Sequence, residues 1–249
     1  LCETLYNQNQ FYKEKMDAAG VKPEDIQSLD DIRRMPFTVK TDLRDNYPTG
    51  IFTAPMEEIA RFHVSSGTTG KPTVVGNSLH DIDQWTECVC RALGCAGGHA
   101  GDVLQVSYGY GLFTGGLGPH YAGERMGMTV IPTSSGNTSR QIMLMEDLQT
   151  NILCCTPSYA LYLGETIRDM GLPLDKLKLR AGVFGAEPWT EEMRHTIEEL
   201  LCIDAMDIYG LSETMGPGVA IECKEAKDGL HFWEDQFIFE ILDPDTLEP

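Results

Sequence analysis

Residues 151–185 read NILCCTPSYALYLGETIRDMGLPLDKLKLRAGVFG, with a long amphipathic segment between two short apolar ones. The outer segments, 151–157 and 177–185, predict strands. Apolar residues at helical spacing predict a helix over 157–171. A strand, a helix and a strand in this order predict a parallel strand pair covered by a helix.

The same alternation continues on both sides of this stretch. Further strands are predicted over 102–108, 128–132 and 202–210, and further helices over 139–150 and 190–201. Thr190 is the predicted N-cap of the last helix, with Glu191 and Glu192 in its first turn. The pattern therefore predicts an α/β fold with a helix-covered, mostly parallel sheet.

The two ends of the chain differ from this core. Residues 1–60 predict one helix and a proline-punctuated cover segment, and 61–215 form the predicted α/β core. Residues 230–242, LHFWEDQFIFEIL, alternate like β structure, so 216–249 is predicted to begin an antiparallel β subdomain. Both termini look cut, the first in mid-helix and the last beyond an unpaired strand, so we expect a piece of a longer protein.

Charge and cysteine content limit the partners. Lys and Arg total 19 against 38 Asp and Glu, a formal charge of −19, which argues against nucleic acid or an anionic membrane as the partner. The eight cysteines show no secreted framework, and no signal peptide or long apolar run is present. We therefore expect a soluble, cytoplasmic protein with reduced thiols.

The most polar stretch is SSGTTGKPT, residues 65–73, between two short apolar-alternating segments that predict a strand–loop–strand element. It is not a Walker A loop, because Pro72 stands where that motif has its magnesium-binding hydroxyl. Its hydroxyls and backbone N–H groups can still surround an anion, with Lys71 nearby. An ordinary hairpin loop would have the same spacing.

Two further segments follow predicted strands directly: FGAEPWT (184–190) and DIYGLSET (207–214). Ligands of open α/β sheets bind at the carboxyl ends of strands. Gly185 and Gly210 allow close backbone approach, Tyr209 offers a flat ring, and Glu213 offers a carboxylate for Mg²⁺.

A glycine- and aromatic-rich segment, 107–124, also follows a strand. It indicates either a small-molecule pocket with an aromatic wall or a glycine-dense helix entry with core aromatics. Cys88 and Cys90 point to different faces of a predicted helix and are expected to be structural. Cys223 and His231 are two metal-ligand types at short spacing, and two ligands do not make a zinc site.

These motifs, in this order, resemble those of the phenylacetate–CoA ligases, a branch of the adenylate-forming superfamily. The resemblance covers essentially the whole chain, including PFTVKTDLRDNYP (36–48) and YGYGLFTGG (108–116). The first motif is shared by the superfamily, whereas GAEPWT and YGLSETMGPG are particular to the phenylacetate branch. The resemblance implies a ligase that converts an aryl acid to an acyl-adenylate with Mg·ATP and then transfers the acyl group to coenzyme A.

The resemblance also implies roles for individual residues. In the nucleotide site, the 65–71 loop would hold the β- and γ-phosphates, the 185–188 segment would border the adenine, and Tyr209 would flank its ring. Ser212 would lie near the α-phosphate and Glu213 would hold Mg²⁺. The residues assigned to ATP are Ser65, Ser66, Gly67, Thr68, Thr69, Gly70, Lys71, Gly185, Ala186, Glu187, Pro188, Asp207, Tyr209 and Gly210. The candidates for the acyl pocket are Tyr108, Tyr110, Phe113 and Gly116.

The chain also departs from the family pattern. Relatives continue into a β-barrel part and a small C-terminal domain, which carries the Lys that contacts the reacting carboxylate. This chain lacks that Lys, so we expect it to be inactive by itself. Some relatives carry a downstream Cys-x-Cys that could complete a zinc site with Cys223 and His231.

Two other functions stay open at this point. One is transfer of AMP to a cofactor hydroxyl, as in the coenzyme F390 synthetases, and the other is a nucleotide-binding module without chemistry. The aromatic residues near Tyr110 and Phe113 favour an aryl acid without identifying it. Relatives are often dimers, so the resemblance allows a homodimer.

Overall fold

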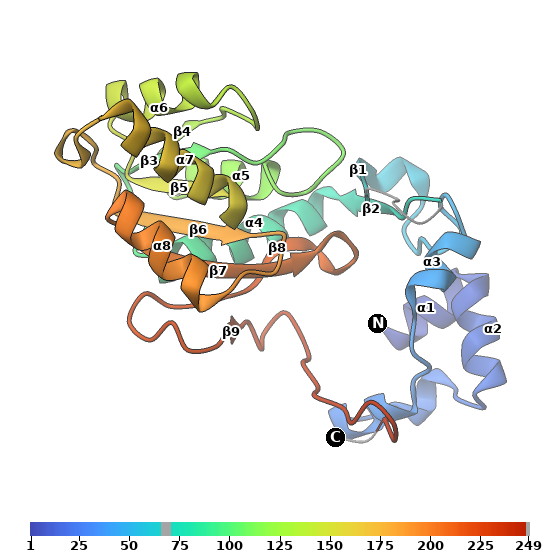
Figure 1. Cartoon of the computed structure of the whole chain (residues 1–249). Helices are drawn as coiled ribbons and strands as arrows, with labels where there is room; N and C mark the ends of the chain where they lie inside the picture. The colour runs from blue at the N-terminus through green and yellow to red at the C-terminus, as the bar shows by residue number, and fades with distance from the viewer. Residues whose placement is uncertain (66–70, 248–249) are drawn as a thin grey trace. The chain divides into compact units, whose positions relative to one another are not determined.

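The computed structural model describes residues 1–65 and 71–247 (Figure 1). The chain divides into two compact units, Leu1–Ile82 and Asp83–Pro249. The first unit is mainly helical and ends in a β-hairpin. Its helices are α1 (Cys2–Gln8), α2 (Gln10–Ala18) and α3 (Lys40–Asp45), its 3-10 turns are η1 (Pro23–Asp25), η2 (Leu29–Arg34) and η3 (Met56–Glu58), and its antiparallel strands are β1 (Ile59–Val64) and β2 (Val74–Ser78).

The single helix predicted at the N-terminus is wrong, because the structure has two helices that meet at Asn9. The backbone of Asn9 is extended, and its side-chain oxygen accepts a hydrogen bond from Tyr12 N–H at 3.3 Å. Its side-chain amide donates to Gly50 O and Phe52 O, both at 2.9 Å. An asparagine side chain that bonds to backbone groups in this way ends one helix and caps the next.

The second unit is built on a seven-stranded sheet in the order β4-β3-β5-β6-β7-β8-β9. The first five strands in this order are parallel, and the last two join antiparallel. The predicted α/β fold with a mostly parallel sheet is therefore confirmed. The strands are β3 (Val103–Val106), β4 (Thr129–Ile131), β5 (Ile152–Cys155), β6 (Ala181–Gly185), β7 (Asp204–Leu211), β8 (Gly216–Ile221) and β9 (His231–Phe232).

Helices cover both faces of this sheet and give it two hydrophobic cores. On one face lie α4 (Leu79–Cys95, which begins in the first unit) and α5 (Leu117–Arg125). On the other lie α6 (Thr138–Asp147), α7 (Pro157–Met170) and α8 (Glu191–Leu201), of which α7 and α8 run side by side in Figure 1. Strand β5 alternates between the cores, since Ile152 and Cys154 pack on the α4 side and Leu153 and Cys155 on the α7 side. Burial on both faces explains why the strand sequence is continuously apolar.

The helix ends follow local capping chemistry. The Thr190 hydroxyl accepts a hydrogen bond from Met193 N–H at 3.2 Å, which confirms the predicted N-cap of α8. Thr156 caps α7 in the same way, with Pro157 at the first helical position, and Gly171 ends the helix with φ 66°. These N-caps fix where α7 and α8 begin, and therefore where the loops after β5 and β6 end.

The β structure predicted over 230–242 is wrong beyond Phe232, because the described chain continues there in turns and irregular backbone. Phe239 folds back to stack on Phe232, with ring centroids 4.2 Å apart. Ile238 and Ile241 are exposed. Alternating apolar residues form a strand only when neighbouring backbone is present to satisfy their N–H and C=O groups. Among the described residues, no helix has the length and apolar character needed to cross a bilayer.

Candidate functional site

The carboxyl ends of the parallel strands in the second unit face one edge of the sheet. Strands β3, β5, β6 and β7 are consecutive neighbours in the sheet. The segments that follow them, at 107–116, 156–158, 186–190 and 212–214, are therefore brought to the same edge. All the predicted nucleotide and acyl residues of the second unit lie in these segments, at the end of β6 or in β7. This edge is the candidate active site.

Tyr108 is a buried residue of the segment that follows β3. Burial raises the pKa of Tyr108 well above its usual range, so the phenol stays protonated. The Thr114 hydroxyl oxygen of the same segment lies 3.5 Å from that of Ser212, which follows β7. The segments after β3 and β7 are therefore in contact at this edge.

The other acyl-pocket candidates lie nearby with different surroundings. The Tyr110 hydroxyl lies 3.1 Å from His120 Nδ1, and His120 Nε2 lies 3.3 Å from a Glu124 carboxylate oxygen. Burial also raises the pKa of Tyr110. Phe113 is 46% exposed, and Gly116 is the buried N-cap residue of α5.

A cavity of about 430 Å³ opens at the ends of β3 and β5. Tyr108 is the only one of the four acyl-pocket candidates among the described residues that line it. The lining residues are Ser107, Tyr108, Gly109, Ser135, Thr156, Ser158, Tyr159 and Tyr162. The sequence reasoning missed Thr156, which follows β5, and the residues contributed by α7. The rule that ligands bind at strand ends, applied to TPSY (156–159) at the end of the predicted strand, would have found Thr156, Ser158 and Tyr159.

The segment after β6 is packed tightly against the protein itself. A Cβ added to Gly185 would lie 2.2 Å from the backbone oxygen of Ile208, so only glycine fits there. Ala186 has the left-handed φ of 72°. A Glu187 carboxylate oxygen accepts a hydrogen bond from Ser158 N–H at 2.7 Å, in the first turn of α7. The Glu187 side chain therefore serves a helix N-terminus, and Ala186 and Pro188 are the exposed residues of the segment.

The segment at the end of β7 presents a ring and a carboxylate. Tyr209 is 42% exposed, so its ring is accessible to a ligand. A Cβ on Gly210 would lie 1.9 Å from the backbone oxygen of Gly216, so this glycine is also required by the neighbouring strand. Glu213 is half-buried, with one carboxylate oxygen shielded from solvent. Burial raises the pKa of Asp207, a residue of β7.

The predicted phosphate loop belongs to the first unit, between β1 and β2. Ser65 N–H donates to Thr73 O, and Thr73 N–H donates to the Ser65 hydroxyl, both at 2.9 Å, which closes the ends of the loop. The Lys71 ammonium lies 5.6 Å from the centroid of the Tyr47 ring. Ser66, Gly67, Thr68, Thr69 and Gly70 lie outside the described residues. The strand–loop–strand prediction is confirmed for the flanking strands.

The predicted zinc half-site gains no ligand within the described parts of the chain. Cys223 follows β8 and His231 begins β9. No group of three or more His, Cys, Asp or Glu side chains in residues 1–65 and 71–247 is arranged to hold a metal ion. A carboxylate such as Glu213 has the hard oxygen ligands that Mg²⁺ takes together with phosphate oxygens, so its chemistry fits the proposed magnesium role.

A family model described as AMP-binding enzyme matches residues 4–249, almost the entire chain. The chain belongs to the AMP-binding enzymes. Curated relatives include the phenylacetate-coenzyme A ligases of Pseudomonas putida (55% identical over 243 residues) and Thermus thermophilus (51% identical over 245 residues). Each match covers 98% of this chain and 55% of the relative, so the chain spans about half the length of these relatives.

Solved structures support the same family. A 2-hydroxyisobutyryl-CoA ligase in an open conformation, in complex with 2-HIB-AMP and CoA, matches with a TM-score of 0.92 and 26% identity. The match covers 99% of this AMP-binding enzyme and 59% of that chain. A long-chain-fatty-acid-CoA ligase from Archaeoglobus fulgidus matches with a TM-score of 0.57 and 17% identity, over 70% of this chain and 35% of that one, and shows the shared fold alone.

Proposed function

We propose that this chain forms the nucleotide- and acid-binding part of a ligase that activates phenylacetate, or a similar aryl acid, and transfers it to coenzyme A. The observation that carries the proposal is the hydrogen bond from Ser158 N–H, in the wall of an aromatic cavity, to the Glu187 carboxylate of the segment assigned to adenine. It joins an acid pocket and a nucleotide segment at one sheet edge. The relatives that match 98% of the chain are named as coenzyme A ligases, which favours thioester formation over AMP transfer.

The residues assigned to ATP divide into three tasks. Tyr209 stacks on the base of ATP, with the backbone of the 185–188 segment on the other side. Ser212 donates its hydroxyl to the α-phosphate, and Glu213 holds Mg²⁺. The 65–71 loop holds the β- and γ-phosphates, so that charge on the departing pyrophosphate is stabilised. ATP supplies the adenylyl group that activates the carboxylate, and coenzyme A supplies the thiol that takes the acyl group.

The cavity supports an aryl acid as the substrate class. Its volume of about 430 Å³ lies in the range of small-molecule pockets, and Tyr108, Tyr159 and Tyr162 give it aromatic walls. Tyr110 and Phe113 extend the aromatic surface on the same loop. All eight cysteines are free thiols, which supports a reducing, cytoplasmic location, and the family resemblance supports a homodimer.

Loss of the magnesium carboxylate tests the adenylation step. In the full-length protein, Glu213→Ala should lower phenylacetate-dependent ATP–pyrophosphate exchange by roughly 100-fold or more, because the charge of the phosphates is no longer balanced. Glu199→Ala, an exposed carboxylate on α8, is the control and should exchange at the wild-type rate. Wild-type exchange by Glu213→Ala would show that Glu213 has no such role.

The length of the chain gives a second test. The family resemblance assigns a catalytic Lys to the part of the relatives that lies beyond this match, so the 249-residue chain alone should bind Mg·ATP without forming phenylacetyl-CoA. Calorimetry measures the binding, and thioester absorbance measures turnover. Rapid thioester formation by this chain would mean that its own residues supply the missing cation.

A further inference from the structure

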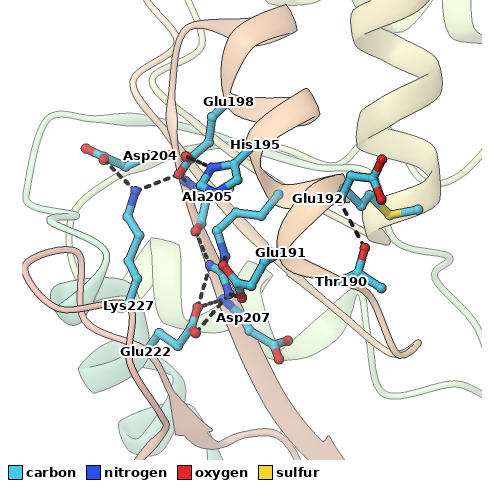
Figure 2. Close-up of polar contacts among 12 residues, drawn as sticks. Thr190, Glu191, Glu192, His195, Glu198, Asp204, Ala205, Asp207, Glu222 and Lys227 are labelled. Carbon is cyan, nitrogen blue, oxygen red and sulfur yellow. Dashed lines mark hydrogen bonds and ion pairs between the residues drawn. The ribbon is translucent and has the colours of Figure 1, made fainter.

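Arg194 of α8 is a buried arginine whose five N–H groups are all used. It is 5% exposed. It donates to the two carboxylate oxygens of Glu222 at 2.7 and 2.9 Å, to the two of Glu191 at 3.0 and 3.1 Å, and to Ala205 O at 2.6 Å. Figure 2 shows Glu191, Ala205 and Glu222 converging from three parts of the second unit. A guanidinium held in this way is fixed in both position and plane.

Glu222 links Arg194 to strand β7 of the sheet. It follows β8 and is also 5% exposed. The carboxylate oxygen that accepts from Arg194 at 2.7 Å also accepts from Asp207 N–H at 2.8 Å, and Glu222 N–H donates to Asp207 O at 3.0 Å. The pair Arg194–Glu222 therefore fixes the backbone of β7 at Asp207.

Trp189 links Arg194 to the 185–188 segment. Its ring centroid lies 4.6 Å from the guanidinium carbon of Arg194, and its ring packs edge-on against Phe184 at 6.0 Å. Trp189 directly follows the 185–188 segment, so these contacts anchor the end of that segment that leaves the sheet.

These contacts of Arg194, Glu222 and Trp189 lie on the face of β7 that carries the Tyr209 side chain. Asp207 and Tyr209 are two residues apart on one strand, so their side chains lie on the same face. The backbone of Asp207 is held by Glu222, and Tyr209 is left exposed. We propose that Arg194, Glu222 and Trp189 are positioning residues that set the gap between the 185–188 segment and the Tyr209 ring to the thickness of an adenine. This role rests on the proposed function of the site.

A second ion cluster on the same helix provides a matched control. Lys227 donates to a Glu198 carboxylate at 2.6 Å and to Asp204 at 2.9 Å, and so also ties α8 to β7 (Figure 2). Asp204 is the first residue of β7, at the opposite end of the strand from Tyr209. Loss of Lys227 should weaken the same helix–strand packing without releasing Trp189.

The experiment compares Trp189→Phe, Arg194→Met and Lys227→Met in the full-length protein. Calorimetry measures the dissociation constants of Mg·ATP and Mg·GTP, and thermal unfolding measures stability. Trp189→Phe should weaken ATP binding about tenfold and Arg194→Met roughly 10- to 100-fold, because small displacements of positioning groups have effects of this size. Both should lower the preference for ATP over GTP, whereas Lys227→Met should lower stability and leave the ATP dissociation constant within about twofold of wild type.

Arg194→Met leaves the Glu222 carboxylate buried without its cation and is at risk of not folding. Trp189→Phe, which keeps a ring beside the guanidinium, then decides the question. Folded Trp189→Phe with wild-type ATP affinity and base preference would overturn the positioning role, as would equal weakening by Lys227→Met. A wild-type protein that binds no ATP would instead overturn the proposed function itself.

Discussion

At the scale of single residues, the strand-end glycines serve the protein's own backbone. Gly185 lies against Ile208 O and Gly210 against Gly216 O, at distances that leave no room for a Cβ. Their presence in a ligand-binding segment suggested close approach to a nucleotide, yet the sheet itself requires them. Ala186 has a left-handed φ although it carries a Cβ. A sequence does not reveal that strain, because alanine normally avoids this conformation.

Alanine at position 185 and glycine at position 186 should have opposite effects on the stability of the fold. Gly185→Ala should destabilise the fold by about 1–3 kcal/mol, because its Cβ meets backbone that cannot move aside. Ala186→Gly should stabilise it by roughly 0.5–1 kcal/mol, because strain at φ 72° is relieved. Urea unfolding of the two variants measures both values. Equal changes of the same sign would contradict the described backbone.

At the scale of elements, the sequence predicted the five parallel strands and α6, α7 and α8 because their apolar periodicity reflects burial between two helix layers. It missed the break at Asn9, where a side chain competes with the helix backbone, and it extended β9 where the described chain has no partner strand. The Arg194 network could not be predicted. Its members, at 189, 194, 207 and 222, share no local spacing and meet only through the fold.

Asp207, in the middle of β7, predicts a pH dependence of stability. Burial raises its pKa in the folded chain, so the folded state binds this proton more tightly than the unfolded state does. The contribution of Asp207 to stability therefore falls as pH rises from its unfolded pKa of about 3.9 through the raised folded value. Asp207→Asn keeps the size of the side chain and removes this loss.

The free energy of unfolding of Asp207→Asn relative to wild type should increase from about pH 4 to about pH 7. Urea titrations across that range measure it. A difference that does not change with pH would mean that Asp207 titrates alike in both states.

The cysteines of the core strand and helix predict a labelling order. Burial raises the pKa of Cys88 to about 11 and that of Cys154 to about 12. Cys202 is exposed at the end of α8. Since the thiolate is the reactive form, iodoacetamide should modify Cys202 first and Cys88 and Cys154 only on unfolding. Mass spectrometry of peptides at successive times tests this order.

At the scale of the whole molecule, the formal charge of −19 governs association. An acidic protein that binds a nucleotide, as we propose for this chain, needs hydrogen-bond donors gathered locally around the phosphates. At low ionic strength the chain should bind an anion exchanger and pass through a heparin column, because its overall field repels polyanions. Retention on heparin would reveal a basic surface large enough to overcome that field.

Strand β5 has a consequence for how every variant above can be measured. Its backbone pairs with β3 on one side and β6 on the other, and its four side chains alternate between two cores. No local opening can expose such a strand, so its amide protons should exchange with deuterium only when the second unit unfolds as a whole. The exchange rates of residues 152–155 therefore report the global free energy of unfolding in native buffer, without denaturant.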